Sequence, residues 1–265
     1  MRRVQKGALE YLVGENLPVP HAFTTRKGGA SKGTLSSMNL GIHRGDLWEN
    51  VLENYGILGN ALGFDSKKVV LTTQTHTDTI RVADETLWGA GLYAPELPPC
   101  DALITRTPGT ALVIFTADCT PILFYDPVTG AVGAAHAGWR GTAADIAGKT
   151  VAAMAKHFGS RPDNIRAAIG PNIGACCFET DRDVPQAMLA LLGEEAYPYI
   201  VPKGHKFHVD LKGINACLLR RAGVVSIDIS TDCTVCNPDL YWSHRTVGSA
   251  RGSQGAIILC KETEK

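Results

Sequence analysis

The sequence has no excess of either charge, because Lys and Arg together number 26 and Asp and Glu also number 26. Without a basic excess, nucleic acid and anionic membrane surfaces are disfavoured as partners. No apolar run reaches the length of a membrane span, since the best run, residues 111–125, is interrupted by Asp118. Residues 1–16 also lack the apolar core of a signal peptide. These absences favour a soluble, cytoplasmic protein that acts on small molecules.

The sequence also lacks the pattern of a disulfide-stapled domain, although it contains eight cysteines. Disulfide frameworks belong to small secreted domains, whereas 265 residues can bury a large core without them. We therefore expect free thiols. Cys233-x-x-Cys236 suggests a metal or redox pair, but no second C-x-x-C is present, and Cys176-Cys177 has a different spacing. The spacing predicts a structural pair of reduced cysteines, and His205 and His208 are expected at the surface.

No linker or internal repeat divides the chain, which predicts a single domain over residues 1–265. Short apolar runs between turn signals predict strands at residues 69–73, 102–105, 111–116, 121–125, 131–136, 165–169, 224–229 and 256–260. Helical spacing predicts helices at residues 46–62, 142–158, 183–192 and 211–222. Asp46 and Thr142 are expected to cap the first two helices. Since no strict βαβ rhythm appears, we expect an α/β fold with a layered mixed β-sheet sandwich and flanking helices.

Three residues with metal-binding side chains interrupt or end the predicted strands, namely His76, Cys119 and His136. Strand ends and strand-to-helix turns present side chains to clefts. Two imidazoles and a thiolate with an open fourth position suit a catalytic Zn²⁺, and Cu²⁺ can take the same set. The separations of 43 and 17 residues match no compact metal motif. The residues alone therefore leave open a Cys119–His136 nucleophilic pair or purely structural roles.

Residues 118–142 (DCTPILFYDPVTGAVGAAHAGWRGT) resemble the central signature of the laccase-domain family, whose members are described as polyphenol oxidases, purine nucleoside phosphorylases or peptidoglycan editing factors. Other segments that resemble the family follow in order along nearly the whole chain, at residues 23–33, 37–41, 74–76, 169–179, 210–215 and 243–245. The resemblance implies an α/β sandwich similar in core to Cys–His deamidase toxins. Carried over by position, it implies that His76, Cys119 and His136 are zinc ligands and catalytic residues.

The resemblance further implies zinc-dependent phosphorolysis of adenosine, inosine, guanosine and methylthioadenosine to free base and ribose-1-phosphate, with adenosine deamination at the same site. A purine nucleoside and phosphate are then the expected partners. Editing of peptidoglycan precursors by hydrolysis is the alternative. A copper polyphenol oxidase fits less well, because the chain has no His-x-His pair for a multicopper centre. A metal store fits poorly with an open three-ligand site.

Five polar residues are the candidate substrate-binding groups, namely Arg26, Asn39, Arg44, Gln74 and Arg140. Arginine suits bidentate contact with anions, and Arg140 follows His136 by four residues. Each candidate has a structural alternative. For Arg140 it is a salt bridge and for Gln74 a strand-end hydrogen bond, while the other three can be solvated loop residues or turn formers.

The chain departs from the family pattern at Tyr55 and at Thr246, where many relatives have arginine. If the first of these arginines binds an anion in relatives, we expect Arg44 or Arg26 to do so here. Asp118 is expected either to accept a hydrogen bond from a ligand imidazole or to cap a turn. Trp139 is expected either to stack on a base or to be buried.

Overall fold

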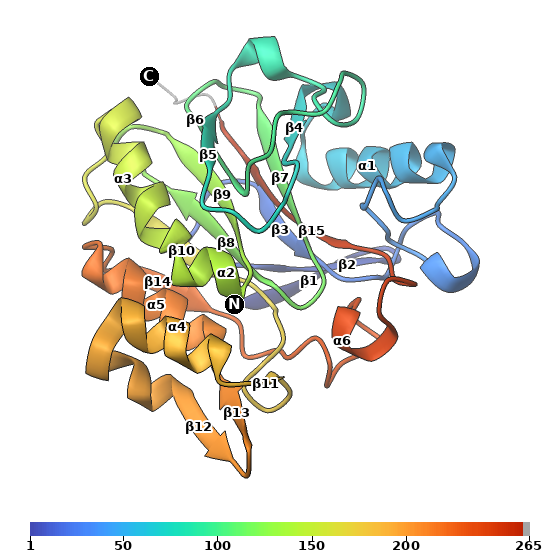
Figure 1. Ribbon diagram of the computed structural model, residues 1–265. Helices are drawn as coiled ribbons and strands as arrows, with labels where there is room; N and C mark the ends of the chain where they lie inside the picture. Colours follow the sequence, from blue (N-terminus) through green and yellow to red (C-terminus); the bar gives the residue numbers. More distant parts are fainter. Residues whose placement is uncertain (262–265) are drawn as a thin grey trace.

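The computed structural model describes residues 1–261, so residues 262–265 of the predicted domain lie outside the described part. Two six-stranded β-sheets pack face to face, and helices cover the outer face of each (Figure 1). This arrangement confirms the predicted layered mixed sandwich with flanking helices. Among the described residues, no helix is both long and apolar enough to traverse a lipid bilayer.

The first sheet has the strand order β1-β2-β3-β15-β7-β4. Its strands are β1 (Arg2–Lys6), β2 (Leu9–Val13), β3 (His21–Thr24), β4 (Val69–Leu71), β7 (Ala111–Thr116) and β15 (Gln254–Leu259). All neighbours are antiparallel except β4 and β7. Helix α1 (Trp48–Leu62) covers the outer face. Strands β1 to β3 were not predicted; β1 is an edge strand of mainly exposed polar residues that lacks an apolar run.

The second sheet has the order β14-β10-β8-β9-β6-β5. Its strands are β5 (Ile80–Val82), β6 (Ala102–Thr105), β8 (Thr120–Tyr125), β9 (Val132–Ala137), β10 (Arg166–Ile169) and β14 (Ser226–Ile229). Helices α3 (Ile146–Phe158), α4 (Asp183–Leu192) and α5 (Leu211–Arg221) lie on its outer side (Figure 1). A turn at residues 126–130 joins the antiparallel strands β8 and β9.

The remaining elements are short. A third sheet contains β11 (Glu179–Thr180), β13 (Lys206–Val209) and β12 (Ile200–Lys203). Two short α-helices are α2 (Trp139–Ala143) and α6 (His244–Val247), and the 3₁₀ helices are η1 (Gly33–Leu35), η2 (Ser66–Lys68), η3 (Glu85–Leu87) and η4 (Gly193–Tyr199). His208 on β13 is only 12% exposed, and its Nδ1 donates to the Ala175 carbonyl at 2.6 Å. The prediction of a surface position was therefore wrong for His208, whereas His205 is exposed.

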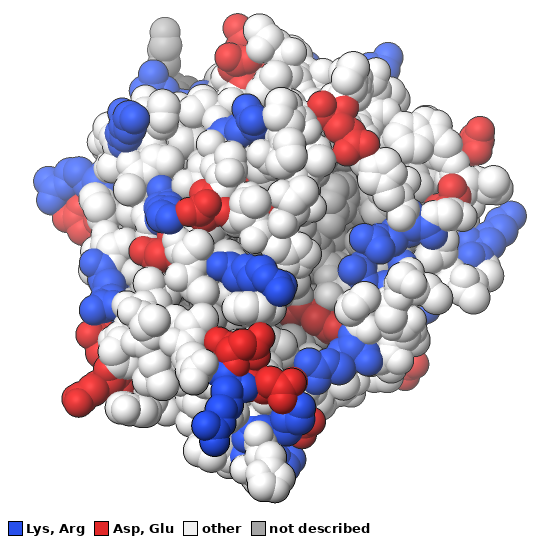
Figure 2. Space-filling view, viewed as in Figure 1, with Lys and Arg blue, Asp and Glu red and all other residues white. Residues whose placement is uncertain are grey.

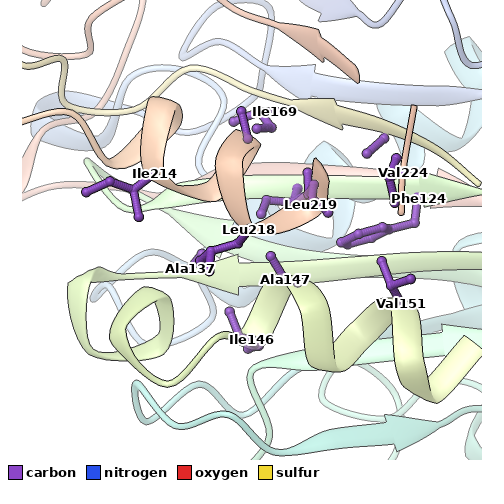
Figure 3. Packing of buried hydrophobic residues seen from close by; sticks show 14 of the residues in the cluster. Phe124, Ala137, Ile146, Ala147, Val151, Ile169, Ile214, Leu218, Leu219 and Val224 are labelled. Carbon is purple, nitrogen blue, oxygen red and sulfur yellow. The ribbon is translucent and has the colours of Figure 1, made fainter. Parts of the chain in front are cut away.

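The core has three apolar layers because successive residues of a strand point to opposite faces of its sheet. Leu112 and Ile114 of β7 pack between the two sheets, and Val113 packs with the α1 layer. On the second sheet, Phe124 of β8 lies beneath helices α3 and α5, next to side chains such as Val151 (Figure 3). Both faces of the central strands are thus buried, which explains their near-continuous apolar sequences.

The predicted helix at residues 142–158 is two helices, and the expected caps were misplaced. Thr142 lies buried inside α2, where its hydroxyl accepts a hydrogen bond from Asn215. Asp145 caps α3 instead, with a positive φ of 56° and its carboxylate accepting from the Gly148 N–H. Helix α1 begins at Trp48, one residue later than an Asp46 cap requires. The Asp46 carboxylate accepts from the Leu47 N–H, outside the helix.

Candidate metal centre

His76, Cys119 and His136 converge at one end of the second sheet. Cys119 directly precedes β8 and His136 is in β9, and the pairing of these strands sets Pro121 opposite His136. His76 lies in the segment between β4 and β5. One ligand atom from each residue lies within 4.8 Å of the other two. Cys119 Sγ is 3.8 Å from His76 Nε2, and the two imidazole centroids are 4.9 Å apart with an interplanar angle of 83°.

This donor set fits a zinc ion. Zinc bonds of about 2.0–2.1 Å to nitrogen and about 2.3 Å to sulfur place tetrahedral ligands roughly 3.5 Å apart. The observed separations need only small side-chain adjustments to reach that value. Nδ1 of His136 is already hydrogen-bonded within the protein, so Nε2 is the nitrogen left for a metal. Three protein ligands leave a fourth position open, which is the pattern of catalytic rather than structural zinc. The same donors accept Cu²⁺.

Asp101 orients two of the three candidate ligands from a fully buried position. Its Oδ1 accepts from Nδ1 of His136 at 2.8 Å and from the backbone N–H of His76 at 3.1 Å. Its Oδ2 accepts from the backbone N–H groups of Thr75 and Thr77 and from the Thr77 hydroxyl. Sequence reasoning missed Asp101. The available signal was a carboxylate directly before an apolar strand, where burial requires a partner.

Opposite charges stabilise one another among Asp101, His136 and Cys119. Burial raises the pKa of Asp101, but the hydrogen bond and charge of His136 outweigh it and lower the pKa to about 2. Burial also raises the pKa of Cys119, and the imidazoles of His136 and His76 lower it to about 6. Burial lowers the pKa of His136, while the Cys119 thiolate and Asp101 raise it to about 9. The charged forms of Cys119 and His136 therefore favour each other.

The backbone around the ligands is tightly constrained. His76 has a φ of 63° and Asp118, next to Cys119, a φ of 88°, both in the left-handed region that non-glycine residues rarely adopt. A Cβ on Gly138 would lie 2.9 Å from His76 Cδ2 and 3.2 Å from Cys119 Sγ. Only glycine therefore leaves both ligands in place. Strained residues of this kind persist where surrounding contacts hold them, often at functional sites.

Asp118 makes no hydrogen bond to an imidazole among the residues that the structure describes. Its Oδ1 accepts from the Thr234 hydroxyl at 2.6 Å, and its Oδ2 accepts from the Ser243 hydroxyl and the Arg245 N–H. The expectation of a hydrogen bond to a ligand ring is therefore wrong for Asp118, and Asp101 fills that role. The alternative, a capping role, agrees with the structure because Asp118 binds the start of helix α6.

A cavity of about 250 Å³ opens at the centre. It is lined by His76, Ala117, Asp118, Cys119, Ile173, Phe178, His244, Arg245 and Arg251. The molecular face in Figure 2 is hollowed near its middle, and basic side chains gather on the side of the hollow toward α1 and α6. His76, Cys119 and His136 together form the triad. A larger hollow of about 660 Å³ lies elsewhere, against β1 to β3, and is lined by no member of the triad. The cavity of about 250 Å³ is the one in which candidate metal ligands lie near positively charged side chains.

None of the five predicted substrate-binding residues lines the triad cavity. Arg26 stacks over Trp242 at 3.8 Å and donates to the carbonyls of Ser36 and Pro238. Asn39 is buried, and its amide is used by Gly41, Asp46 and Ser253. Gln74 bonds both the N–H and the carbonyl of Phe115 and accepts from the Thr72 hydroxyl. Binding substrate through Asn39 or Gln74 would require breaking these bonds.

The other two predicted residues are less constrained. Arg140 is exposed, makes no salt bridge with the described residues, and stacks over the half-buried Trp139 at 4.3 Å. Arg44 lines a separate cavity of about 150 Å³ together with Gln74. Tyr55 of α1, at the position where many relatives have arginine, is fully buried and donates to the Leu40 carbonyl. That position therefore faces the core.

Arg251 is the main cavity residue that sequence reasoning missed. Its Nη1 donates to the Gly252 carbonyl and to the Ser253 hydroxyl, while its buried Nε has no partner among residues 1–261. Burial lowers the pKa of Arg251, and the nearby charge of Arg44 lowers it further, to about 10. A half-buried guanidinium beside a second cation, with an unused buried donor, is suited to an anionic ligand.

Comparison with known proteins shows the family of this chain. The model of the family described as multi-copper polyphenol oxidoreductase laccase matches residues 20–261. A purine nucleoside phosphorylase from Deinococcus radiodurans is 40% identical over 251 residues, which cover 94% of this chain and 92% of that protein. The adenosine deaminase RL5 of an unknown prokaryotic organism is 35% identical over 237 residues, with 87% and 90% coverage.

Among solved structures, the Bacillus licheniformis hypothetical protein YfiH superposes with a TM-score of 0.91 at 34% identity. The superposition covers 97% of this chain and 98% of that one. Family match, sequence identity and fold therefore agree over nearly the full length. The chain belongs to the multi-copper polyphenol oxidoreductase laccase family.

Proposed function

We propose that this chain is a zinc-dependent purine nucleoside phosphorylase that also deaminates adenosine, with residues 1–265 acting as one domain. The observation that carries the proposal is the convergence of His76, Cys119 and His136 within 4.8 Å. Two of these residues, His76 and Cys119, line a cavity that Arg251 also lines. Relatives named purine nucleoside phosphorylase and adenosine deaminase support the substrate class. Zn²⁺ held by these three residues with an open position supplies Lewis-acid chemistry.

Arg251 and Arg44 are proposed to bind the phosphate. The Nε of Arg251 is buried and makes no hydrogen bond with the described residues, and Arg44 brings a second positive charge close to it. Phosphate offers several acceptor oxygens and negative charge to both guanidinium groups. Arg245 is less available, because its guanidinium donates to the carbonyls of Cys177 and Glu179.

The nucleoside base is proposed to lie against the apolar wall formed by Ile173 and Phe178. Aromatic and aliphatic side chains provide contact area, and a few polar groups orient the ligand. Asp101 holds His136 through Nδ1 and fixes the loop that carries His76, so the two imidazoles are positioned before substrate arrives. The proposed centre contains only two histidines, His76 and His136, which is too few for a multicopper relay.

Phosphate dependence tests the proposal. Metal-replete protein is incubated with adenosine in the presence and absence of phosphate, and adenine and inosine are followed by chromatography. Adenine that forms only with phosphate, accompanied by slower inosine formation, supports both activities. Inosine alone would reduce the proposal to a deaminase. No turnover of any purine nucleoside, with turnover of a peptidoglycan precursor, would replace it with editing.

His136→Ala tests the metal centre directly. The variant is expected to lose bound metal and nucleoside turnover while keeping its circular dichroism spectrum. His157→Ala is the matched control, because His157 is exposed near the end of α3 and outside the centre. Elemental analysis of protein purified without added metal distinguishes zinc from copper. Full activity in His136→Ala would refute the proposed centre.

A further inference from the structure

Four cysteines from two separate loops meet outside the candidate metal centre. Cys176 and Cys177 follow β10, and Cys233 and Cys236 follow β14. Their four Sγ atoms all lie within 4.8 Å of one another. Cys236 Sγ is 3.6 Å from that of Cys176 and 3.5 Å from that of Cys177. The thiols are free, and these distances far exceed the roughly 2.05 Å of a disulfide bond.

The spacing of the four sulfurs fits a single tetrahedral ion. Four sulfurs at about 2.3 Å from zinc lie about 3.8 Å apart in a regular tetrahedron. Tetrahedral sets of four thiolates select Zn²⁺ or iron. Each sulfur lies this close to every other sulfur. The set therefore fits a single metal ion better than a cluster of several metal ions. The sequence spacing did not reveal this set, because its two pairs lie more than fifty residues apart and one pair consists of adjacent residues.

The backbone near the four cysteines lies close to their sulfur atoms. The Gly174 N–H donates to Cys233 Sγ at 3.2 Å, and a Cβ on Gly174 would lie only 3.2 Å from Cys176 Sγ. Lys212 is 8% exposed, and its Nζ donates to the Asp232 carbonyl, directly before Cys233. Zn²⁺ bound by four thiolates carries a net negative charge, which a neighbouring N–H group and a buried ammonium stabilise.

We propose that Cys176, Cys177, Cys233 and Cys236 bind a second Zn²⁺, a structural ion distinct from the ion of the triad. Four protein ligands close the coordination sphere, so this ion has no open position for chemistry. The structural pair predicted from Cys233-x-x-Cys236 alone thereby becomes half of a four-ligand site. The proposal does not depend on the reaction that the triad performs.

The second ion would stabilise the two loops that form one wall of the triad cavity. Ile173 and Phe178, on either side of the first cysteine pair, line that cavity. Thr234, next to Cys233, donates through its hydroxyl to Asp118 and through its N–H to the Asn172 carbonyl. Joining the two loops through one ion therefore fixes residues that face substrate, and removing it is expected to loosen them.

Metal stoichiometry tests the proposal on the full-length protein. Protein purified without added metal is analysed for zinc per chain by mass spectrometry, and the wild type is expected to hold two. Cys236→Ser and Cys119→Ser are each expected to hold one, lost from different sites. Cys236 is exposed, so its replacement does not open a core cavity. Cys217→Ser is the matched control, since Cys217 lies near Glu195 and outside both groups of ligands.

Cobalt substitution identifies which site is affected. Co²⁺ in a four-thiolate site gives strong sulfur-to-cobalt charge-transfer and visible bands, whereas a site with one thiolate gives a much weaker signal. The strong bands are expected in the wild type, Cys119→Ser and Cys217→Ser and are expected to disappear in Cys236→Ser. One zinc per chain in the wild type with no strong cobalt bands would overturn the proposal. Disulfides among these cysteines in metal-free protein purified under reductant would overturn it as well.

Discussion

Nδ1 of His136 donates a 2.8 Å hydrogen bond to Oδ1 of Asp101, and both side chains are almost completely buried. The same oxygen accepts from the backbone N–H of His76. One carboxylate therefore sets the ring orientation of one proposed ligand and the backbone position of another. It also fixes which nitrogen of His136 remains available, because a ring nitrogen that donates a hydrogen bond cannot bind a metal.

Replacing Asp101 is expected to weaken zinc binding at the triad. Asp101→Asn removes the charge and replaces one acceptor oxygen by an NH₂ group, so some N–H donors of the loop lose their partner. Loss of such a supporting group typically costs about 10- to 100-fold in metal affinity. Affinity is measured by competition with a chelator in a Cys236→Ser background, so that only the triad is titrated. Asp118→Asn is the control, and a smaller loss in Asp101→Asn than in this control would contradict the assigned role.

A single methyl group at Gly138 is expected to displace two ligands. In Gly138→Ala the new Cβ would overlap His76 and crowd Cys119, although the φ of −67° suits alanine. Displacement of reacting groups by about 1 Å can cost about 10²-fold in rate. We expect a loss of that order in kcat/KM for nucleoside. Gly56→Ala in α1 is the control, because its Cβ meets no atom within 4 Å; equal activity of the two variants would exclude the crowding argument.

Zinc affinity at the triad is expected to rise with pH. In the metal-free centre the pKa of Cys119 is lowered to about 6 and that of His136 is raised to about 9. Between these values the thiolate is already formed, whereas His136 must lose its Nε2 proton to bind zinc. One proton is therefore released per ion, and affinity is expected to increase about tenfold per pH unit in that range. Calorimetry in buffers of different ionisation enthalpy measures the number of protons released per zinc ion. Zinc binding that does not depend on pH would contradict the assigned ligand role of His136.

Arg251 is expected to affect phosphate more than nucleoside. Hydrogen bonds to charged groups contribute about 1.5–3 kcal/mol, which corresponds to about 10- to 100-fold in binding. Arg251→Met keeps much of the side-chain volume but removes the charge and all donors, so the KM for phosphate is expected to rise by that factor. Arg161→Met is the control, since Arg161 is exposed and pairs with Asp163. An unchanged phosphate KM would remove Arg251 from the proposed site.

The corrected start of α3 has a measurable consequence for stability. Asp145 caps the helix through the Gly148 N–H from a left-handed backbone conformation. Asp145→Ala is expected to lower the free energy of unfolding by about 0.5–2 kcal/mol, because it removes the cap and strains the backbone. Asp145→Asn keeps an acceptor and tolerates the same φ, so its effect is expected to be smaller. Urea denaturation compares the two variants, and equal losses would argue against capping as the cause.

Strands with nearly continuous apolar sequences were predictable from the sequence. The runs that form β7, β8 and β9 are buried on both faces, so their composition alone indicates strands. Strand β1 was not predicted because it lies at a sheet edge and has mostly exposed polar side chains. The start of α3 was missed because Asp145 and Thr142 are equally plausible caps by residue type. Only the packing of Thr142 against Asn215 decides between them.

By itself the sequence determined the class of fold, since buried strands are local features of the chain, and its resemblance to a family singled out the three residues proposed to bind zinc. Tertiary structure decided which side chains support that centre, because Asp101, Arg251 and the four clustered cysteines have meaning only through partners remote along the chain. A buried carboxylate, an unpaired guanidinium donor and a set of thiols are each ordinary features alone. Their chemistry depends on distance and burial, and both are set only when the sheets and loops pack together.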